Sequence, residues 1–234
     1  MISNPVHSDD DMRRQRLNQG AFEKRDHWVK WRGERCGWKA FFIVLFCLQL
    51  SSMAGDVADE HAWRVWLDPK SMHAAASTPI GGAKRTLIAG GYRGEDDLMA
   101  FSKEEFASLN LEWDGFVAKA RTNCASDLAL LKPHYVRNRK KVIVYAELTS
   151  DQPVVASAVL APKFLDLFAD TLGPKVLVVV PNQFTAYVFP ALVSDYQDYE
   201  PMVRQAFGAT AHPVSMEVLE FSAEGIKAVG IYGS

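Results

Sequence analysis

Five consecutive apolar residues, Val176 to Val180, constrain the fold of this chain more than any other stretch. Gly173-Pro174 precedes the run and Pro181-Asn182-Gln183 follows it, so residues that favour turns bound it on both sides. Four of the five residues are valines, whose branched side chains favour strands. A strand that is apolar at every position has both faces covered. The run therefore predicts the central strand of a sheet.

The segments beside this strand predict hairpins and a helix. Residues 142–148 and 153–160 are typical of the two strands of one hairpin, and residues 186–189 of the partner of the central strand. Pro162 suits the first turn of a helix, which we expect to begin near Lys163 and to end at Gly173. Within that helix, apolar residues recur at three- and four-residue spacing and predict one buried face: Phe164, Leu165, Phe168 and Leu172.

The C-terminal part of the chain repeats this plan. We expect a helix from Pro201 to Phe207, stopped by Gly208, and then a hairpin of residues 214–221 and 226–232. The connections inside the hairpins are too short for parallel crossovers. The sequence therefore predicts an α+β fold, in which hairpin, helix, hairpin, helix and hairpin form a largely antiparallel sheet with the helices packed on one face.

A helical segment is expected before the first hairpin. Ser102 and Glu105 have the spacing of a capping box, and Phe101 and Phe106 that of a hydrophobic staple. A stripe of apolar residues that includes Cys124 then continues to Leu131, so Cys124 is expected to be a small buried residue. These signals place the α+β domain at residues 101–234.

Residues 55–100 give weaker signals. They are expected to form a poorly structured or loop-rich lead-in, with at most a short strand at residues 61–67. Gly90, Gly91 and Gly94 lack the spacing of a phosphate-binding loop, and we interpret them as a turn.

Residues 1–54 have the layout of a signal peptide. Nine Lys and Arg residues stand against six Asp and Glu residues, the run 40–50 is apolar apart from one Gln, and Ser52-Met53-Ala54 supplies small residues for cleavage. The apolar run is shorter than the roughly 20 residues that span a bilayer. We therefore expect export to the periplasm or the outside of the cell, with an uncleaved anchor at residues 40–54 as the alternative.

The charge of the remaining 180 residues restricts their partners. These residues carry 17 basic and 22 acidic side chains, and this negative balance argues against nucleic acid, whose phosphates attract clustered Lys and Arg. The basic run VRNRKK at residues 136–141 is interpreted as a solvated loop, with contact to an anion or a membrane surface as the alternative. Contact with a membrane is otherwise expected only through an uncleaved N-terminal segment, and the partner is an unidentified protein or small molecule.

The sequence contains none of the common catalytic or zinc-binding motifs. The remaining candidates for chemistry form an acidic group with one histidine: Asp195, Asp198, Glu200 and His212. Carboxylates at this spacing can share a cation or act as an acid and a base, but they also suit the start of a helix. Tyr187 and Tyr199, with other aromatic residues near the second hairpin, are candidates for a binding surface. No cofactor and no metal site is assigned.

The order of elements from Val142 onward, with VLVVVPNQFTAYVFP at its centre, resembles the YtpQ-like family of uncharacterised bacterial proteins. This resemblance covers about the last 95 residues and implies an α+β fold with no assigned activity. Two hypotheses follow from the residues. The first is a non-catalytic binding or interaction module of the bacterial cell envelope, and the alternative is a hydrolase-type enzyme that uses the acidic group with a divalent cation.

Overall fold

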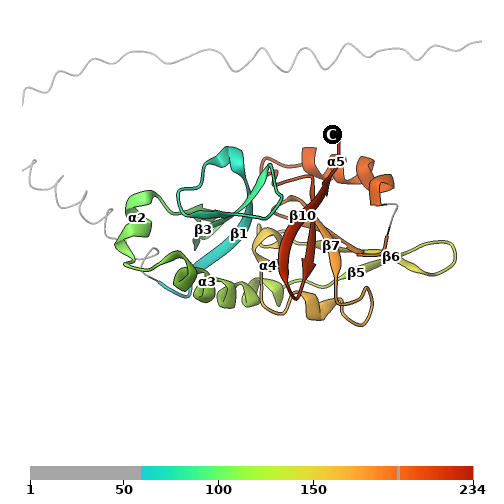
Figure 1. The fold of residues 1–234 in the computed structure, drawn as a ribbon, viewed down its shortest axis with the longest axis horizontal. Helices are drawn as coiled ribbons and strands as arrows, with labels where there is room; N and C mark the ends of the chain where they lie inside the picture. The colour runs from blue at the N-terminus through green and yellow to red at the C-terminus, as the bar shows by residue number, and fades with distance from the viewer. Residues whose placement is uncertain (1–58, 194–195, 234) are drawn as a thin grey trace, which may run out of the picture. The chain divides into compact units, whose positions relative to one another are not determined.

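The computed structural model describes residues 59–193 and 196–233. In these residues two antiparallel β-sheets lie beside each other with short helices around them (Figure 1). The predicted α+β class and the largely antiparallel pairing are confirmed. The signal peptide or anchor predicted for residues 1–54 lies outside the described residues.

The first sheet contains four strands from the region predicted to be a loop-rich lead-in. They are β1 (Trp63–Pro69), β2 (Ser77–Pro79), β3 (Thr86–Arg93) and β4 (Leu98–Ala100), with β3 pairing with each of the others and a single turn, η1 (Lys70–Met72), after β1. The prediction of a loop-rich lead-in for residues 55–100 is therefore wrong over the part that the structure describes, although β1 falls on the short strand expected at residues 61–67. The signal for β1 was weak because this strand is buried on both faces and carries Arg64 and Asp68, which hide the alternation typical of a strand.

Gly90 and Gly91 lie inside β3, so the predicted turn is also wrong. A β-carbon at Gly90 would lie 2.6 Å from the ring of Phe116, and one at Gly91 would collide with the Met99 carbonyl oxygen. Only glycine leaves room there for the neighbouring helix and strand to approach the backbone of β3.

Two helices connect the sheets, α2 (Lys103–Ser108) and α3 (Trp113–Leu128). The predicted capping box is present: the Ser102 hydroxyl accepts from the Glu105 N–H, and the Glu105 carboxylate accepts from the Ser102 N–H. The staple is present as well, with the Phe101 and Phe106 rings 6.1 Å apart. α3 buries Phe116, Ala120 and, as predicted, Cys124.

The second sheet has six strands in the order β10-β9-β7-β8-β6-β5. Their bounds are β5 (His134–Arg137), β6 (Ile143–Thr149), β7 (Val176–Asn182), β8 (Thr185–Pro190), β9 (Glu217–Ser222) and β10 (Gly225–Ile231). β7 is buried at every position and lies between β9 and β8, which confirms the predicted central strand. The hairpin of β9 and β10 is also where the sequence places it.

Helices cover both faces of this sheet, and the predicted packing on one face is wrong. Val178 on β7 belongs to the larger core, which includes α3 and α4 (Val155–Ala158). Its neighbour Val179 belongs to a smaller core beneath α5 (Glu200–Gly208). Because alternate side chains of a strand point to opposite faces, β7 supplies two separate cores.

The connection between β6 and β7 differs most from the prediction. Residues 153–160 form α4 with its flanking turns rather than a strand, because a short run that is apolar throughout fits a buried helix as well as a buried strand. The helix expected from Lys163 reduces to turns around η2 (Leu165–Leu167), although Phe164, Phe168 and Leu172 are buried as predicted. Gly173 has a positive φ of 99°, as a helix-ending glycine requires.

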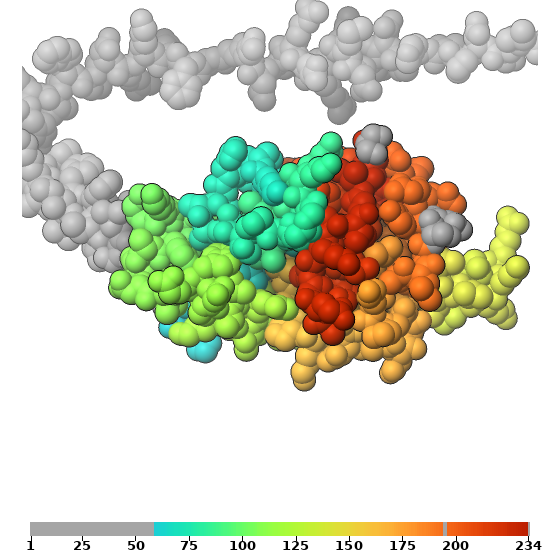
Figure 2. Space-filling view, viewed as in Figure 1, coloured from blue at the N-terminus to red at the C-terminus, as the bar shows by residue number. Residues whose placement is uncertain are grey.

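The two sheets are joined by the side chain of Glu217 on β9. Its carboxylate accepts from the backbone N–H groups of Lys84 and Arg85 and from the Thr86 hydroxyl, all at the start of β3. Gly81 and Lys227 add a parallel β-bridge between the sheets. Figure 2 shows the C-terminal hairpin as a stripe between the N-terminal strands and the rest of the second sheet.

Within residues 59–193 and 196–233, no helix combines the length and hydrophobicity that crossing a bilayer requires.

Candidate binding site

The structure separates the members of the predicted acidic group. Asp195 lies outside the described residues. Asp198 lies in η3 (Tyr196–Tyr199), and Glu200 at the start of α5 forms an ion pair with Arg204 one turn later. His212 lies 3.9 Å from Asp97 of the first sheet and packs its ring against Phe184. Among the described residues, no three His, Cys, Asp or Glu side chains come close enough together to hold a metal ion.

The two tyrosines proposed for a binding surface lie in the smaller core. Tyr187 is only 5% exposed, and burial raises the pKa of its hydroxyl to about 12. Tyr199 is half-buried against Tyr145 and Phe189, with ring centres 5.3 and 5.1 Å away. These rings pack η3 and α5 against the sheet, and this packing is the role that the structure shows for them.

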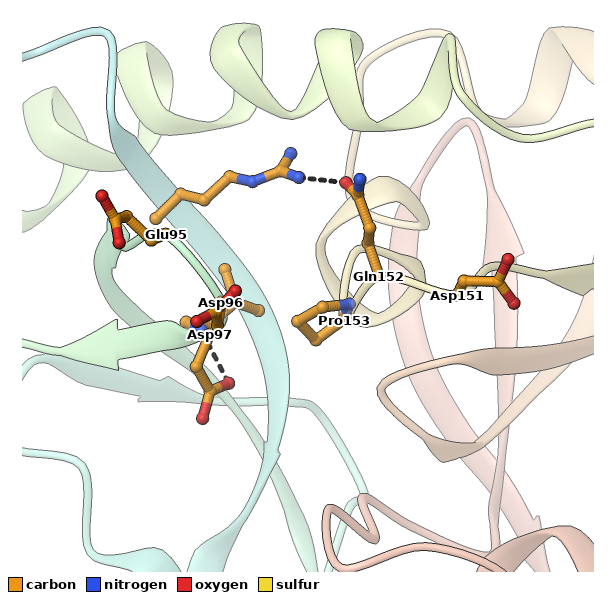
Figure 3. Close-up of a pocket in the computed structure, with 8 residues that line it drawn as sticks. Glu95, Asp96, Asp97, Asp151, Gln152 and Pro153 are labelled. Atoms are coloured by element: carbon orange, nitrogen blue, oxygen red, sulfur yellow. Dashed lines mark hydrogen bonds between the residues drawn. The ribbon is translucent and has the colours of Figure 1, made fainter.

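A small polar pocket lies between the β3–β4 loop and the loop after β6 (Figure 3). Its volume is about 150 Å³, which is below the 300–1,000 Å³ of ordinary ligand sites. The carboxylates of Glu95, Asp97 and Asp151 at its rim point in different directions, so they do not converge on one bound group (Figure 3). Asp97 accepts from the Leu98 N–H at 2.7 Å and so stabilises its own loop.

Arg93, at the side of this pocket, is engaged by the protein itself. One terminal nitrogen donates to the buried carboxylate of Asp127 at 2.7 Å, and the other donates to the Gln152 side chain. Asp127 also accepts from Arg64 at 2.9 Å and from the Ser157 hydroxyl at 2.6 Å. This network ties β1, β3, α3 and α4 together, and it fixes both terminal nitrogens of Arg93 against the protein.

A larger groove of about 570 Å³ runs between the two sheets. One wall comes from residues 79–81 and Ile88, the other from the β9–β10 hairpin, and the floor from the segment after α4. The surface of the groove is more polar than apolar, and Ser222 and Glu224 are among its polar lining residues. Its apolar lining residues are Pro79, Ile80, Ile88, Val159, Ala161, Pro162, Phe164, Leu165, Phe221, Ala223 and Ile226. Its volume lies in the range of sites for a small molecule or a short peptide segment.

Arg121 on α3 is the cationic side chain of this groove. Its Nε donates to the Leu160 carbonyl oxygen at 2.9 Å, which fixes the position of the guanidinium group. Neither of its terminal nitrogens has an acceptor among the described residues. Arg121 is itself exposed, so its terminal nitrogens are open to solvent and to a ligand beside the apolar residues of the groove. This combination suits a carboxylate attached to an apolar body.

No pattern in the sequence signals this groove. Arg121 follows Ala120 on a helix and looks like any solvent-facing cation, and the lining residues come from four separate stretches of the chain. Their proximity depends on the pairing of the two sheets, which no local pattern predicts.

Comparison with known proteins adds no relative. The chain matches no family model, no curated protein and no solved structure.

Proposed function

We propose that this protein is a non-catalytic binding module of the bacterial cell envelope, and that its ligand is an apolar carboxylate held in the groove beside Arg121. The observation that carries the proposal is the guanidinium group of Arg121, fixed by Leu160 yet without an acceptor for its terminal nitrogens among the described residues. Placement in the envelope rests on the leader pattern of residues 1–54.

The groove offers a ligand both apolar surface and a positive charge. Phe164 and Phe221 are buried beneath it, whereas Leu165 and Ile226 are half-buried and so keep apolar surface for a ligand. Arg121 supplies the charge, and its planar fork matches the two oxygens of a carboxylate. A fatty acid and the carboxyl end of an apolar peptide share this chemistry.

Isothermal titration calorimetry with four probes tests the proposal and separates these two sources. The first pair is decanoate and decanol, and the second is an acetylated leucine dipeptide with a free or an amidated carboxyl end. Binding of decanoate but not decanol identifies the acyl source, and binding of the free but not the amidated dipeptide identifies the peptide source. A protein that binds none of the four, or that ignores the carboxylate in both pairs, overturns the proposal.

Arg121→Gln should weaken the binding of the preferred carboxylate about 10- to 100-fold, because a hydrogen bond to a charged group contributes about 1.5–3 kcal/mol. Lys163→Gln is the matched control, since Lys163 is an exposed cation near the groove that does not line it. Equal affinities for the two variants would contradict the assigned role of Arg121.

Export is tested separately by mass spectrometry of the protein purified from its own source. A mature mass that begins at Gly55 supports placement in the envelope. A mass that still includes residues 40–54 in a membrane fraction supports the anchored alternative.

A further inference from the structure

The loop between β5 and β6 projects from the edge of the second sheet (Figure 1; yellow knob in Figure 2). It carries four exposed basic side chains within five residues: Arg137, Arg139, Lys140 and Lys141. None of them forms an ion pair within the described residues. The tip therefore concentrates positive charge on a chain whose described part is negative overall.

Hydrogen bonds within the loop hold it in a defined turn. The Asn138 side chain accepts from the backbone N–H groups of Lys140 and Val142 at 2.9 and 3.1 Å. Lys141 takes the left-handed conformation with φ of 62°, and Arg137 donates to the Lys141 carbonyl oxygen at 2.9 Å. These contacts use backbone groups of Lys140, Lys141 and Val142, so the ammonium groups of the two lysines remain free for an outside partner.

An aliphatic residue accompanies these charges. Val142 is 58% exposed, and Val136 and Ile143 beside it are half-buried. Cations next to exposed aliphatic side chains fit the interface of a phospholipid bilayer, where the cations contact the headgroups and the aliphatic groups enter the acyl boundary. A nucleic acid would favour aromatic rings for stacking, and the described turn, residues 137–142, contains none.

We propose that the β5–β6 turn, residues 137–142, is a docking element for anionic phospholipid membranes. It lies at the β5 edge of the second sheet, whereas the groove adjoins β10 at the other edge, so docking leaves the groove accessible. The proposal adds a membrane contact beyond the N-terminal segment and does not depend on the ligand of the groove.

Vesicle co-sedimentation tests it, with vesicles of phosphatidylcholine alone and of phosphatidylcholine with 30% phosphatidylglycerol. The protein, with residues 1–54 removed to exclude the leader, should bind the anionic vesicles in about 50 mM salt and lose binding at about 500 mM, because salt screens the attraction. The double variant Arg139→Glu, Lys140→Glu should lower the partition coefficient by about tenfold or more.

The matched control is Lys132→Glu with Lys163→Glu, which changes the net charge equally at two exposed cations outside the turn. An equal loss in the control would show a response to net charge alone and would overturn the proposal. Val142→Ser should reduce binding with no change of charge. Absence of anionic vesicle binding by the unaltered protein, or tighter binding to a single-stranded 20-nucleotide DNA than to the vesicles, would also overturn it.

Discussion

The carboxylate of Glu217 lies 2.6 Å from the hydroxyl of Thr86, across the junction of the two sheets. The same carboxylate accepts from the N–H groups of Lys84 and Arg85, so one buried side chain satisfies the two backbone donors just before β3. Glu217→Ala leaves these donors unpaired, and it should lower the free energy of unfolding by about 3 kcal/mol or more, as measured by urea denaturation.

Glu220→Ala on the same strand is the control. Glu220 pairs with Lys227 at 3.0 Å and Lys175 at 3.5 Å near the surface, and such pairs contribute about 0–1 kcal/mol. If the two variants were destabilised equally, Glu217 would not be the main link between the sheets.

Asp127 should contribute as much to the free energy of unfolding as Glu217 does, through its ion pairs with the first sheet. Asp127→Asn removes the carboxylate that pairs with both Arg64 and Arg93, and it leaves the nearly buried Arg64 without a counter-charge. Breaking a buried pair in this way costs about 3–5 kcal/mol. The measurement is the thermal or urea midpoint relative to Asp114→Asn, an exposed carboxylate in the first turn of α3. A loss no larger than that of the control would contradict this prediction.

The titration of Asp68 should make the stability of the protein depend on pH. Burial raises the pKa of its carboxyl from 3.8 to about 6. Between these values the folded protein retains a proton that the unfolded chain has released, so the contribution of Asp68 to the free energy of unfolding falls as the pH rises from about 4 to 6.

Asp68→Asn removes this contribution. Above pH 6 the variant should be more stable than the unaltered protein, by up to about 3 kcal/mol, and the difference should disappear below pH 4. Denaturant titrations of both proteins at pH 4, 5, 6 and 7 measure it. A difference that does not change with pH would show that Asp68 does not titrate in this range.

Cys124 should be chemically inert while the protein is folded. Its thiol is fully buried and lies 3.4 Å from the Val65 carbonyl oxygen, and burial raises the pKa of the thiol to about 11. A thiol reagent at pH 8 should therefore react only after unfolding, with a rate that rises through the urea transition. Stoichiometric reaction in the absence of denaturant would contradict the buried position.

The sequence predicted those features that are encoded locally. The capping box at Ser102, the central strand at Val176–Val180, the positive φ of Gly173 and the C-terminal hairpin each follow from a few adjacent residues. The prediction of a strand at residues 153–160 was wrong because a run of apolar residues fits a buried helix as well as a strand.

The first sheet and the groove depend on contacts across long separations in the chain. Arg64 and Asp127 are 63 residues apart, and the groove brings Arg121 beside residues 221–226. In the sequence such residues look like ordinary surface charges. Their roles appear only when a distant partner buries or surrounds them.

The position of the C-terminal hairpin determines when the molecule can be completed. Thr86 and its partner Glu217 are 131 residues apart, and β9 and β10 lie between the first sheet and the rest of the second sheet (Figure 2). During synthesis the first sheet emerges before the second, and the 131 residues from Thr86 to Glu217 must be made before the link between the sheets can form. A newly made chain thus lacks the link between the two sheets until β9 has left the ribosome.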